Sequence, residues 1–472
     1  MALPSPEVPD AAEGGPPEFG RARPVQDAHS VRGLTRRHPS AIFIRILMKM
    51  RESGPVKPRR AEFLVMGGGI GGLAAALALA REGRRVLVLE RAAEFGEVGA
   101  GLQVGPNASR MLDRLGVLPA VTRDAFFPRR LLLRDAVTGA PITALETADA
   151  FRERFGYRYL VTHRADLHRA VLEACRDTGF VELLPAKRVL EVEPRAGGAL
   201  VRCADGTRYD TDALVAADGV HSLARGLLVA DGPPVDSGYV AYRGTVGVAE
   251  LVARGGLPEP DGMVIWVGAG RHLVQYPVRR GELCNQVATF DTRAFPTASG
   301  ENSGKSDTSH TSDIGAQLDR AFQGTCAEVT RGVEMVDRSR RWAMVDRLPA
   351  AGWSQGHLTL LGDAAHPMLQ YLAQGACQAI EDAVVLADSV SAHPGDVEAA
   401  FKAYEAIRFP RTARVQTTAR TWGEILHVGG IGATERAALL GQRAADDFQP
   451  VDWLYGDPLC PNPAGDIRED VR

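Results

Sequence analysis

Residues 61–90 read AEFLVMGGGIGGLAAALALAREGRRVLVLE, and this stretch decides the fold. The short apolar run at 63–66 is typical of a buried strand, and the alanine-rich segment at 73–80 predicts a helix. A second apolar run at 86–89 predicts the next strand. Strand, turn, helix and strand in this order form a parallel α/β unit. We therefore expect ordered structure to begin at Glu62 and to contain a parallel sheet.

The turn of this unit carries the pattern G-x-G-x-x-G at Gly67, Gly69 and Gly72. Gly67 permits the tight turn, Gly69 lets a pyrophosphate approach the backbone, and Gly72 lets helix and strand pack closely. Glu90 ends the second strand 23 residues after Gly67. A carboxylate there accepts hydrogen bonds from ribose hydroxyls and repels a 2′-phosphate. The site therefore favours FAD or NAD over NADP.

Two later strands end in aspartate at positions where α/β sheets bind ligands. The segment 212–222 ends its apolar run in Asp218-Gly219, and the segment 360–367 ends its own in Gly362-Asp363. Alone, either aspartate fits a turn capped by its own side chain. Together with the glycine pattern, the pair favours FAD over NAD.

Composition excludes several classes of protein. Lys plus Arg is 55 and Asp plus Glu is 58, so the net charge is −3 and no global positive field attracts nucleic acid. The six cysteines are far apart and form no C-x-x-C pair, which argues against a disulfide framework or a metal site and favours a reducing cytoplasm. No apolar run reaches the ~18 residues of a membrane span.

The pattern along the chain predicts a split organisation. Alternating apolar runs at 239–246, 263–267, 272–277 and 283–290 predict strands of an antiparallel sheet. The expected parts are an N-terminal extension at 1–60, the first part of a dinucleotide-binding domain at 61–231, a sheet region at 232–345 with a polar flexible loop at 296–312, the second part of the dinucleotide-binding domain at 346–395, and a helical region at 396–472. For residues 1–60 two readings stay open: a disordered or transit-like extension, or a true start at Met48 or Met50.

The three motifs, in this order, resemble those of the FAD-dependent aromatic hydroxylases, the group A flavoprotein monooxygenases. The resemblance covers about residues 60–456. It is closest to the 3-hydroxybenzoate 6-hydroxylase branch, with salicylate hydroxylase as a wider relative, and is carried by the segments 95–107, 161–167, 240–245, 272–277, 362–382 and 452–456. It implies an α/β fold with an α+β insert: a Rossmann-like FAD-binding domain, an inserted antiparallel substrate-binding sheet and a C-terminal helical region.

The resemblance also implies further contacts to FAD beyond the glycines and Glu90. Asp363 would bind the ribityl chain, and the helix that begins near Gly375 would direct its positive end at the flavin, where reduced flavin carries negative charge. The remaining cofactor-binding residues that it implies are Gln103, Arg110, Asp218 and Ala376.

A catalytic set follows from one strand and one later loop. On the strand at 272–277, His272 and Tyr276 share a face and their Cα atoms lie roughly 13 Å apart. A phenol ring needs a proton acceptor to become a good nucleophile, and histidine suits this task near neutral pH. The resemblance implies that His272 and Gln370 activate the phenol, while Tyr276 and Tyr159 position the substrate.

The activity implied is single-component aromatic hydroxylation with bound FAD, NADH or NADPH, and dioxygen. The leading reaction converts 3-hydroxybenzoate to 2,5-dihydroxybenzoate through a flavin C4a-hydroperoxide. The alternatives are a salicylate-hydroxylase-like or natural-product tailoring enzyme, an NAD-dependent dehydrogenase, and a flavin-binding protein without turnover. We expect a cytoplasmic monomer or homodimer without a metal, a membrane span or a nucleic-acid partner.

Overall fold

The computed structural model describes residues 57–97, 99–296, 311–457 and 459. The strands are β1 (Arg59–Met66), β2 (Val86–Leu89), β3 (Gly101–Val104), β4 (Arg130–Asp135), β5 (Pro141–Glu146), β6 (Leu160–His163), β7 (Val181–Leu184), β8 (Val189–Arg195), β9 (Gly198–Cys203), β10 (Arg208–Ala216), β11 (Val235–Gly247), β12 (Met263–Gly268), β13 (Arg271–Val278), β14 (Leu283–Asp291), β15 (Arg341–Asp346), β16 (Ser354–Gln355) and β17 (Leu358–Leu360). The helices are α2 (Ile70–Arg81), α3 (Pro106–Arg114), α4 (Leu118–Thr122), α5 (Asp149–Phe155), α6 (Arg164–Asp177), α7 (Leu223–Leu228), α8 (Val248–Ala253), α9 (Thr311–Ala321), α10 (Ala327–Glu334), α11 (Gly375–Ala392), α12 (Val397–His427), α13 (Ile431–Gly441) and α14 (Asp452–Tyr455), with short 3-10 turns η1 (Arg279–Gly281), η3 (Gly362–Ala364), η4 (Gln370–Leu372) and η5 (Gln449–Val451).

The first sheet contains the predicted parallel unit. Its strands follow the order β16-β17-β10-β1-β2-β7, and β1 pairs in parallel with both β2 and β10. The expected start at Glu62 is three residues late, because Arg59 and Arg60 already pair with Tyr209 and Asp210 on β10. The rest of the expected N-terminal extension, residues 1–56, lies outside the described residues.

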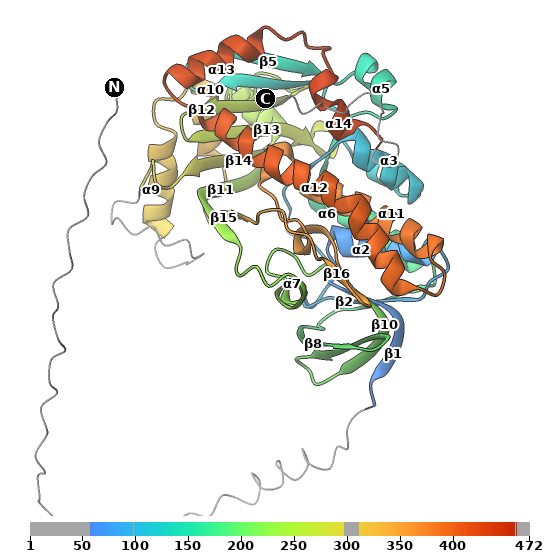
Figure 1. Cartoon of the computed structure of the whole chain (residues 1–472). Helices are drawn as coiled ribbons and strands as arrows, with labels where there is room; N and C mark the ends of the chain where they lie inside the picture. The colour runs from blue at the N-terminus through green and yellow to red at the C-terminus, as the bar shows by residue number, and fades with distance from the viewer. Residues whose placement is uncertain (1–56, 98, 297–310, 458, 460–472) are drawn as a thin grey trace, which may run out of the picture. The chain divides into compact units, whose positions relative to one another are not determined.

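Helix α2 is buried on almost every side, which explains its alanine-rich sequence. It lies between the sheet and α11, and α11 approaches closely at two glycines, Gly71 of α2 and Gly362 of η3. A Cβ on Gly71 or on Gly362 would lie 3.0 or 3.1 Å from the Cβ of Ala379 on α11. This packing brings the amino ends of α2 and α11 to the same edge of the sheet (Figure 1).

The second sheet contains the four strands predicted between residues 239 and 290. Its order is β15-β11-β14-β13-β12-β4-β5. The structure differs from expectation in one respect: β4 and β5 come from residues 130–146, inside the segment assigned to the first domain, and β4 pairs with β12 in parallel. Pairing between strands about 130 residues apart leaves no trace in local periodicity, so the sequence pattern could not reveal it.

The two faces of this sheet have different covers. On one face, Trp266 and Leu273 pack with Leu318 of α9 and Val333 of α10. The other face is contacted by Gln370 of η4. It is also crossed by α12, a long helix that contacts β12, β13 and β17 and so reaches both sheets (Figure 1). Most of the polar loop expected at 296–312 lies outside the described residues, but Thr311 already begins α9.

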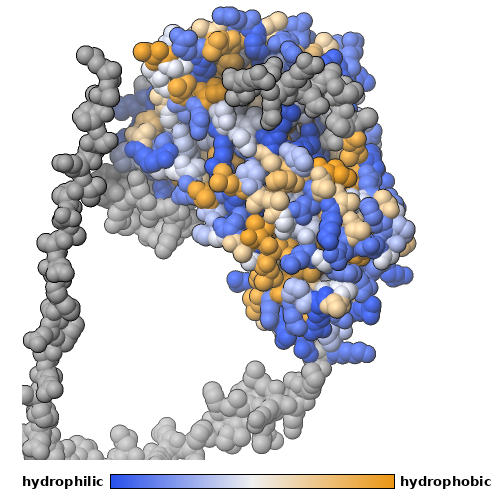
Figure 2. All heavy atoms as spheres, in the orientation of Figure 1, coloured by the Kyte–Doolittle hydropathy of each residue, from blue (hydrophilic) through white to orange (hydrophobic). Residues whose placement is uncertain are grey.

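The surface mixes residue types. Figure 2 shows hydrophobic side chains interspersed among hydrophilic ones over the visible face. Among the helices in the described part of the chain, none has both the length and the apolar composition needed to cross a bilayer.

Candidate active site

The glycine turn after β1 divides into residues that the fold requires and one that it does not. Gly67 has φ +114°, and a Cβ there would lie 2.3 Å from the Ala217 carbonyl oxygen. A Cβ on Gly72 would lie 2.0 Å from the Gly67 carbonyl oxygen. A Cβ on Gly69 would meet nothing closer than the Glu97 carboxylate at 3.6 Å. The space at Gly69 is therefore not used by the protein, as a cradle for a pyrophosphate requires.

Two helix amino ends are free to bind an anion at this edge. Neither α2 nor α11 has a side-chain cap or an acidic residue in its first turn. Gly375 and Ala376 form the start of α11, so their backbone N–H groups lack intrahelical partners. Such ends favour negative charge, in keeping with the predicted contacts to FAD.

Glu90 stands at the end of β2, as the sequence predicted. Its carboxylate accepts hydrogen bonds from the backbone N–H of Gly68 at 2.8 Å and of Ala92 at 2.7 Å. A carboxylate can accept about four hydrogen bonds, so capacity for ribose hydroxyls remains. Glu90 thus also holds the glycine turn in place.

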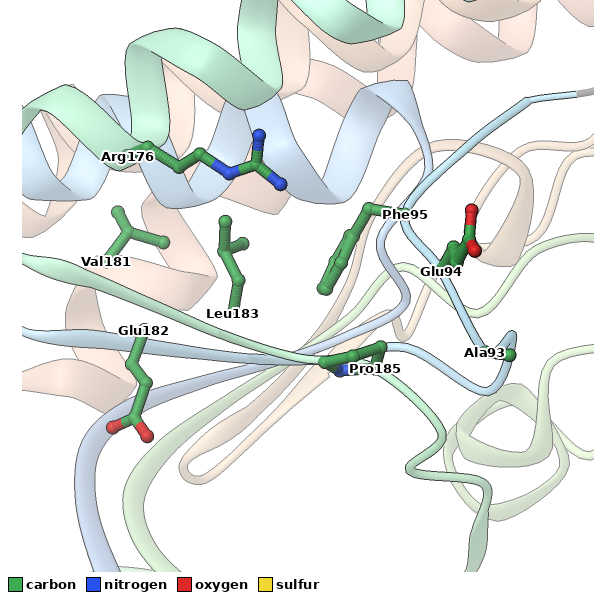
Figure 3. A pocket seen from close by; sticks show the side chains of 8 residues that line it. All are labelled: Ala93, Glu94, Phe95, Arg176, Val181, Glu182, Leu183 and Pro185. Carbon is green, nitrogen blue, oxygen red and sulfur yellow. The ribbon is translucent and has the colours of Figure 1, made fainter.

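A pocket of about 620 Å³ opens beside this turn. Figure 3 shows Phe95, Leu183 and Arg176 directed toward one space, while Glu182 points away from them. The pocket is lined by Ala93, Glu94, Phe95, Arg176, Val181, Glu182, Leu183 and Pro185. None of the predicted catalytic residues lines it, so it is separate from the substrate face described below.

The two predicted aspartates have different surroundings. Asp363 in η3 is exposed and forms no hydrogen bond within the described residues, and its Oδ1 would lie 3.8 Å from a Cβ on Gly375. Although the side chain is accessible to solvent, the protein atoms around it partly desolvate the carboxylate, which raises its pKa against the positive fields of His366 and Arg164. Asp218 instead accepts a hydrogen bond from the Leu223 N–H at 2.8 Å through one oxygen. Its other oxygen is buried without a partner in the described part of the chain.

Gln103 lies on β3 and Arg110 on the following helix α3, and the two side chains have different partners. Gln103 accepts a hydrogen bond from the Tyr159 hydroxyl at 2.7 Å. Arg110 donates to the Phe155 carbonyl at 2.8 Å and lies 3.6 Å from the Asp457 carboxylate. Its Nη1 has no partner among the described residues. The contacts of both residues with FAD stay predictions.

The predicted catalytic strand, β13, presents His272 and Tyr276 on one face. In the register with β14, His272 lies opposite Thr289 and Tyr276 opposite Asn285. His272 is 2% exposed and Tyr276 3% exposed. Between them Val274, Val287 and Ile265 form a row of aliphatic side chains that are only partly buried. Their partial exposure in the middle of a sheet indicates that no protein side chain covers them fully.

Gln370 is brought over this face from the distant η4 turn. Its Nε2 donates to the Thr289 hydroxyl at 3.1 Å, directly beside His272. Its Oε1 accepts from Arg243 Nη2 at 2.8 Å. The structure therefore places Gln370 between His272 and a positive charge, although about 100 residues separate it from His272 in the chain.

Arg243 on β11 was not singled out as a site residue, although it lies in the motif at 240–245. It lies in the same row as Val287 and Val274. Burial lowers the pKa of this guanidinium. Its partners among the described residues are Gln370 and the ring of Trp342, at 5.8 Å, and not a carboxylate, and its Nε is buried without a hydrogen bond. A partly buried cation without an anion is a place for a ligand anion.

His272 has a hydrogen-bond partner at one ring nitrogen among the described residues and none at the other. Its Nδ1 lies 2.7 Å from Nε2 of His427, another residue that the sequence did not suggest. Burial, together with the neighbouring His427, lowers the pKa of His272 well below its usual value, so the ring is neutral at pH 7. No group among the described residues hydrogen-bonds to its Nε2.

The two predicted substrate-positioning tyrosines meet at Gln103. Tyr159 is 3% exposed, and Gln103 also hydrogen-bonds the Tyr276 hydroxyl. A Cβ on Gly101 would lie 2.5 Å from the Tyr276 ring, so only glycine fits on β3 at this point. Burial raises the pKa of both tyrosines, although Arg243 opposes this effect at Tyr276. Both phenols therefore remain protonated and can donate hydrogen bonds.

Comparisons with known proteins agree with this geometry. Residues 60–419 match the family model described as "FAD binding domain". The chain is 40% identical over 403 residues to the 3-hydroxybenzoate 6-hydroxylase of Polaromonas naphthalenivorans (strain CJ2), covering 84% of this chain and 96% of that protein. The crystal structure of Klebsiella pneumoniae HpxO complexed with FAD and uric acid is similar with a TM-score of 0.73 at 30% identity, over 85% of this chain and 98% of that one. A salicylate hydroxylase substrate complex is similar with a TM-score of 0.67 at 26% identity, over 84% and 95% of the two chains.

Proposed function

This chain belongs to the FAD-dependent aromatic hydroxylases, and we propose that it hydroxylates 3-hydroxybenzoate to 2,5-dihydroxybenzoate with NADH or NADPH as electron donor. The single observation that carries the choice of substrate is the placement, over one apolar row, of a histidine nitrogen and a guanidinium, the first with no hydrogen-bond partner and the second with no carboxylate partner among the described residues. His272 provides the first and Arg243 the second. A hydroxybenzoate has both a phenol and a carboxylate to match them.

The spacing of the two groups supports this assignment. His272 lies on β13 and Arg243 on β11, with β14 between them. Two strand spacings of about 5 Å each and a shift of two residues along the strands separate the two Cα atoms by about 12 Å, so these long side chains can contact the phenol and the carboxylate in meta positions of one ring. Val274 and Val287 lie in the same row as Arg243, next to the row of His272, and offer an apolar surface to the ring itself.

The residues then have distinct tasks. His272 accepts the phenol proton at Nε2, which increases electron density on the ring carbon para to the phenol oxygen. Gln370 fixes the direction of the Arg243 guanidinium, and Arg243 binds the carboxylate. Tyr276 donates a hydrogen bond to the substrate, while the Tyr159 hydroxyl donates to Gln103 and so fixes Gln103 beside Tyr276. Bound FAD would pass electrons from NADH or NADPH to dioxygen and activate one of its oxygen atoms for transfer to the ring, while the other leaves as water.

The cofactor set fits the residues at the sheet edge. The open space at Gly69 and the uncapped starts of α2 and α11 suit a pyrophosphate, and Asp363 suits the ribityl hydroxyls. The cysteines in the described part of the chain are free thiols: Cys175, Cys203, Cys284, Cys326 and Cys377. Free thiols support a cytoplasmic location, where NADH and NADPH are available. One chain supplies every residue of the site, so the proposal holds for a monomer and for a homodimer alike.

A panel of ligands tests the substrate. The FAD-loaded protein is mixed with NADH and either 3-hydroxybenzoate, benzoate, 3-hydroxybenzyl alcohol or salicylate, and NADH oxidation is followed. The proposal predicts strong stimulation by 3-hydroxybenzoate, with weaker effects when the phenol or the carboxylate is missing. Equal stimulation by 3-hydroxybenzyl alcohol would remove the role of Arg243, and stimulation by salicylate alone would favour the salicylate-hydroxylase alternative.

A further inference from the structure

His427 is the last residue of helix α12 and contacts the Nδ1 side of the His272 ring, away from the Nε2 atom that we assign to the substrate. Its side chain is buried, and its Nε2 lies 2.7 Å from His272 Nδ1. The ring centroids are 4.9 Å apart and the ring planes differ by 28°. With the nitrogens this close and the centroids this far apart, the rings meet edge to edge, as an in-plane N–H···N hydrogen bond requires.

Neighbouring side chains hold the pair in this position. Tyr239 of β11 stacks on His427 with centroids 4.6 Å apart, and Tyr371 of η4 meets His272 edge-on at 5.7 Å and His427 at 5.3 Å. Arg436 of α13 donates to the carbonyl oxygens of Ile425 and Leu426, which fixes the end of α12. The imidazole of His427 therefore has little freedom to turn away.

The hydrogen bond between the two rings decides which nitrogen of His272 carries the proton. A neutral imidazole has one N–H and one bare nitrogen, and the partner of one nitrogen selects the tautomer. If His272 donates from Nδ1, its Nε2 is bare and can accept the phenol proton. If it accepts at Nδ1, its Nε2 carries hydrogen and cannot act as a base.

We propose that His427 is a positioning residue: its Nε2 accepts the hydrogen bond from His272 Nδ1–H and thereby keeps His272 Nε2 bare toward the substrate. This role rests on the proposed function for its consequence in catalysis, but the tautomer itself does not depend on the identity of the substrate. When the phenol proton moves to His272 Nε2, the Nδ1–H bond to His427 stays in place. Burial lowers the pKa of His427 to about 4, while Asp291 opposes this effect and Arg436 adds to it, so its ring is neutral and able to accept at pH 7.

The direct test is the ¹⁵N NMR spectrum of histidine-labelled, FAD-loaded protein in its oxidised state without substrate. The chain has 11 histidines, so the His272 signals are assigned as those lost in His272→Gln. The proposal predicts a protonated Nδ1 and a bare Nε2 for His272 in the wild-type protein. A protonated Nε2 would overturn the proposal. Because the spectrum is recorded on the wild-type protein, the test does not depend on whether a His427 variant folds.

Two substitutions separate positioning from simple packing. His427→Gln places an amide oxygen where Nε2 stands and should keep both the tautomer and most of kcat. His427→Phe keeps an aromatic ring but has no hydrogen-bond acceptor, so His272 should shift toward the tautomer that carries hydrogen on Nε2. The value of kcat should then fall at least about tenfold, since proton acceptance by a positioned base contributes about 10²–10⁴-fold to the rate. KM for the aromatic ligand should change little, and more hydrogen peroxide should form. An unchanged tautomer, kcat and peroxide yield in His427→Phe would refute the proposal.

His393→Gln is the matched control. His393 follows the far end of α11, an 18-residue helix that begins at the site, and its Nδ1 hydrogen-bonds the Ser389 carbonyl. This variant should keep kcat and the His272 tautomer. If no hydroxybenzoate stimulates NADH oxidation but the His272 tautomer is as predicted, the proposed substrate fails and the role of His427 in fixing the tautomer stands.

Discussion

Alanine at Gly69 and alanine at Gly72 should have opposite effects, although both residues belong to one motif. A Cβ on Gly72 would lie 2.0 Å from a backbone oxygen, far inside the 3.4 Å at which ordinary contacts begin. Neither the helix nor the strand can yield without disturbing the buried packing around α2. Overpacking of this kind costs about 1–3 kcal/mol and sometimes more, and a clash between two backbones belongs at the upper end.

Gly69→Ala meets no such obstacle in the protein. The nearest atom is 3.6 Å away, and the residue has φ −74°, which any amino acid adopts. The unfolding free energy of the apoprotein should therefore change by less than about 1 kcal/mol. The added methyl group does occupy the space predicted for the pyrophosphate. Losing one charge-assisted hydrogen bond of about 1.5–3 kcal/mol corresponds to a rise of roughly 10- to 150-fold in the Kd for FAD.

Thermal unfolding of the apoproteins and titration with FAD, followed by flavin fluorescence, measure the two effects separately. The reasoning predicts that Gly72→Ala lowers the Tm of the apoprotein, whereas Gly69→Ala keeps the Tm and weakens FAD binding. Equal losses of Tm in the two variants, or wild-type FAD affinity in Gly69→Ala, would refute the idea that the space at Gly69 is kept for the cofactor.

Four further predictions concern the substrate face and the buried carboxylates of α11. His272→Ala should keep FAD bound but turn most NADH oxidation toward hydrogen peroxide, and coupled turnover at the wild-type rate would contradict its role as proton acceptor. Arg243→Met should raise KM for 3-hydroxybenzoate by roughly 10- to 150-fold, because a hydrogen bond to a charged group contributes about 1.5–3 kcal/mol. KM for 3-hydroxybenzyl alcohol, which has no carboxylate, should rise far less. An equal rise in KM for both ligands would contradict the role of Arg243 in binding the carboxylate. Asp382→Asn should lower the unfolding free energy by about 3–5 kcal/mol, because Asp382 is fully buried and accepts from Arg408 at 2.6 Å; urea unfolding measures this, and a loss below 1 kcal/mol would contradict it. Burial alone would raise the pKa of Glu381 and of Asp382, but their cationic partners lower both pKa values to about 2, below the ordinary values of 4.5 and 3.8. The contribution of the two carboxylates to stability should therefore be complete above about pH 4.5 and be lost as the pH falls toward 2. A urea unfolding midpoint that stays constant from pH 5 to pH 3 would contradict this.

The sequence predicted the nucleotide-binding part of the fold well because its signals are local. The apolar runs at 63–66 and 86–89 became β1 and β2, and the helix between them formed as α2. The glycine pattern and Glu90 also have a local cause, since the turn that they form lies within one strand–helix–strand unit. The same holds for the strand at 272–277, whose alternation alone places His272 and Tyr276 on one face.

What the sequence could not predict depends on contacts between distant segments. The parallel pairing of β4 with β12 joins residues far apart in the chain, and no periodicity encodes it. Arg243 and His427 matter because of what lies beside them: one lacks an anion and the other faces His272 Nδ1. Their identity as site residues therefore emerged only when the strands and α12 were assembled. The roles of the site residues in catalysis and in FAD binding stay predictions.

The central claim is that this chain inserts oxygen para to the phenol of 3-hydroxybenzoate. The most direct measurement is product identification by mass spectrometry and chromatography after turnover of the FAD-loaded protein with NADH, 3-hydroxybenzoate and ¹⁸O₂. The account predicts 2,5-dihydroxybenzoate that carries one ¹⁸O atom. A 2,3- or 3,4-dihydroxybenzoate, or a product without ¹⁸O, would contradict it.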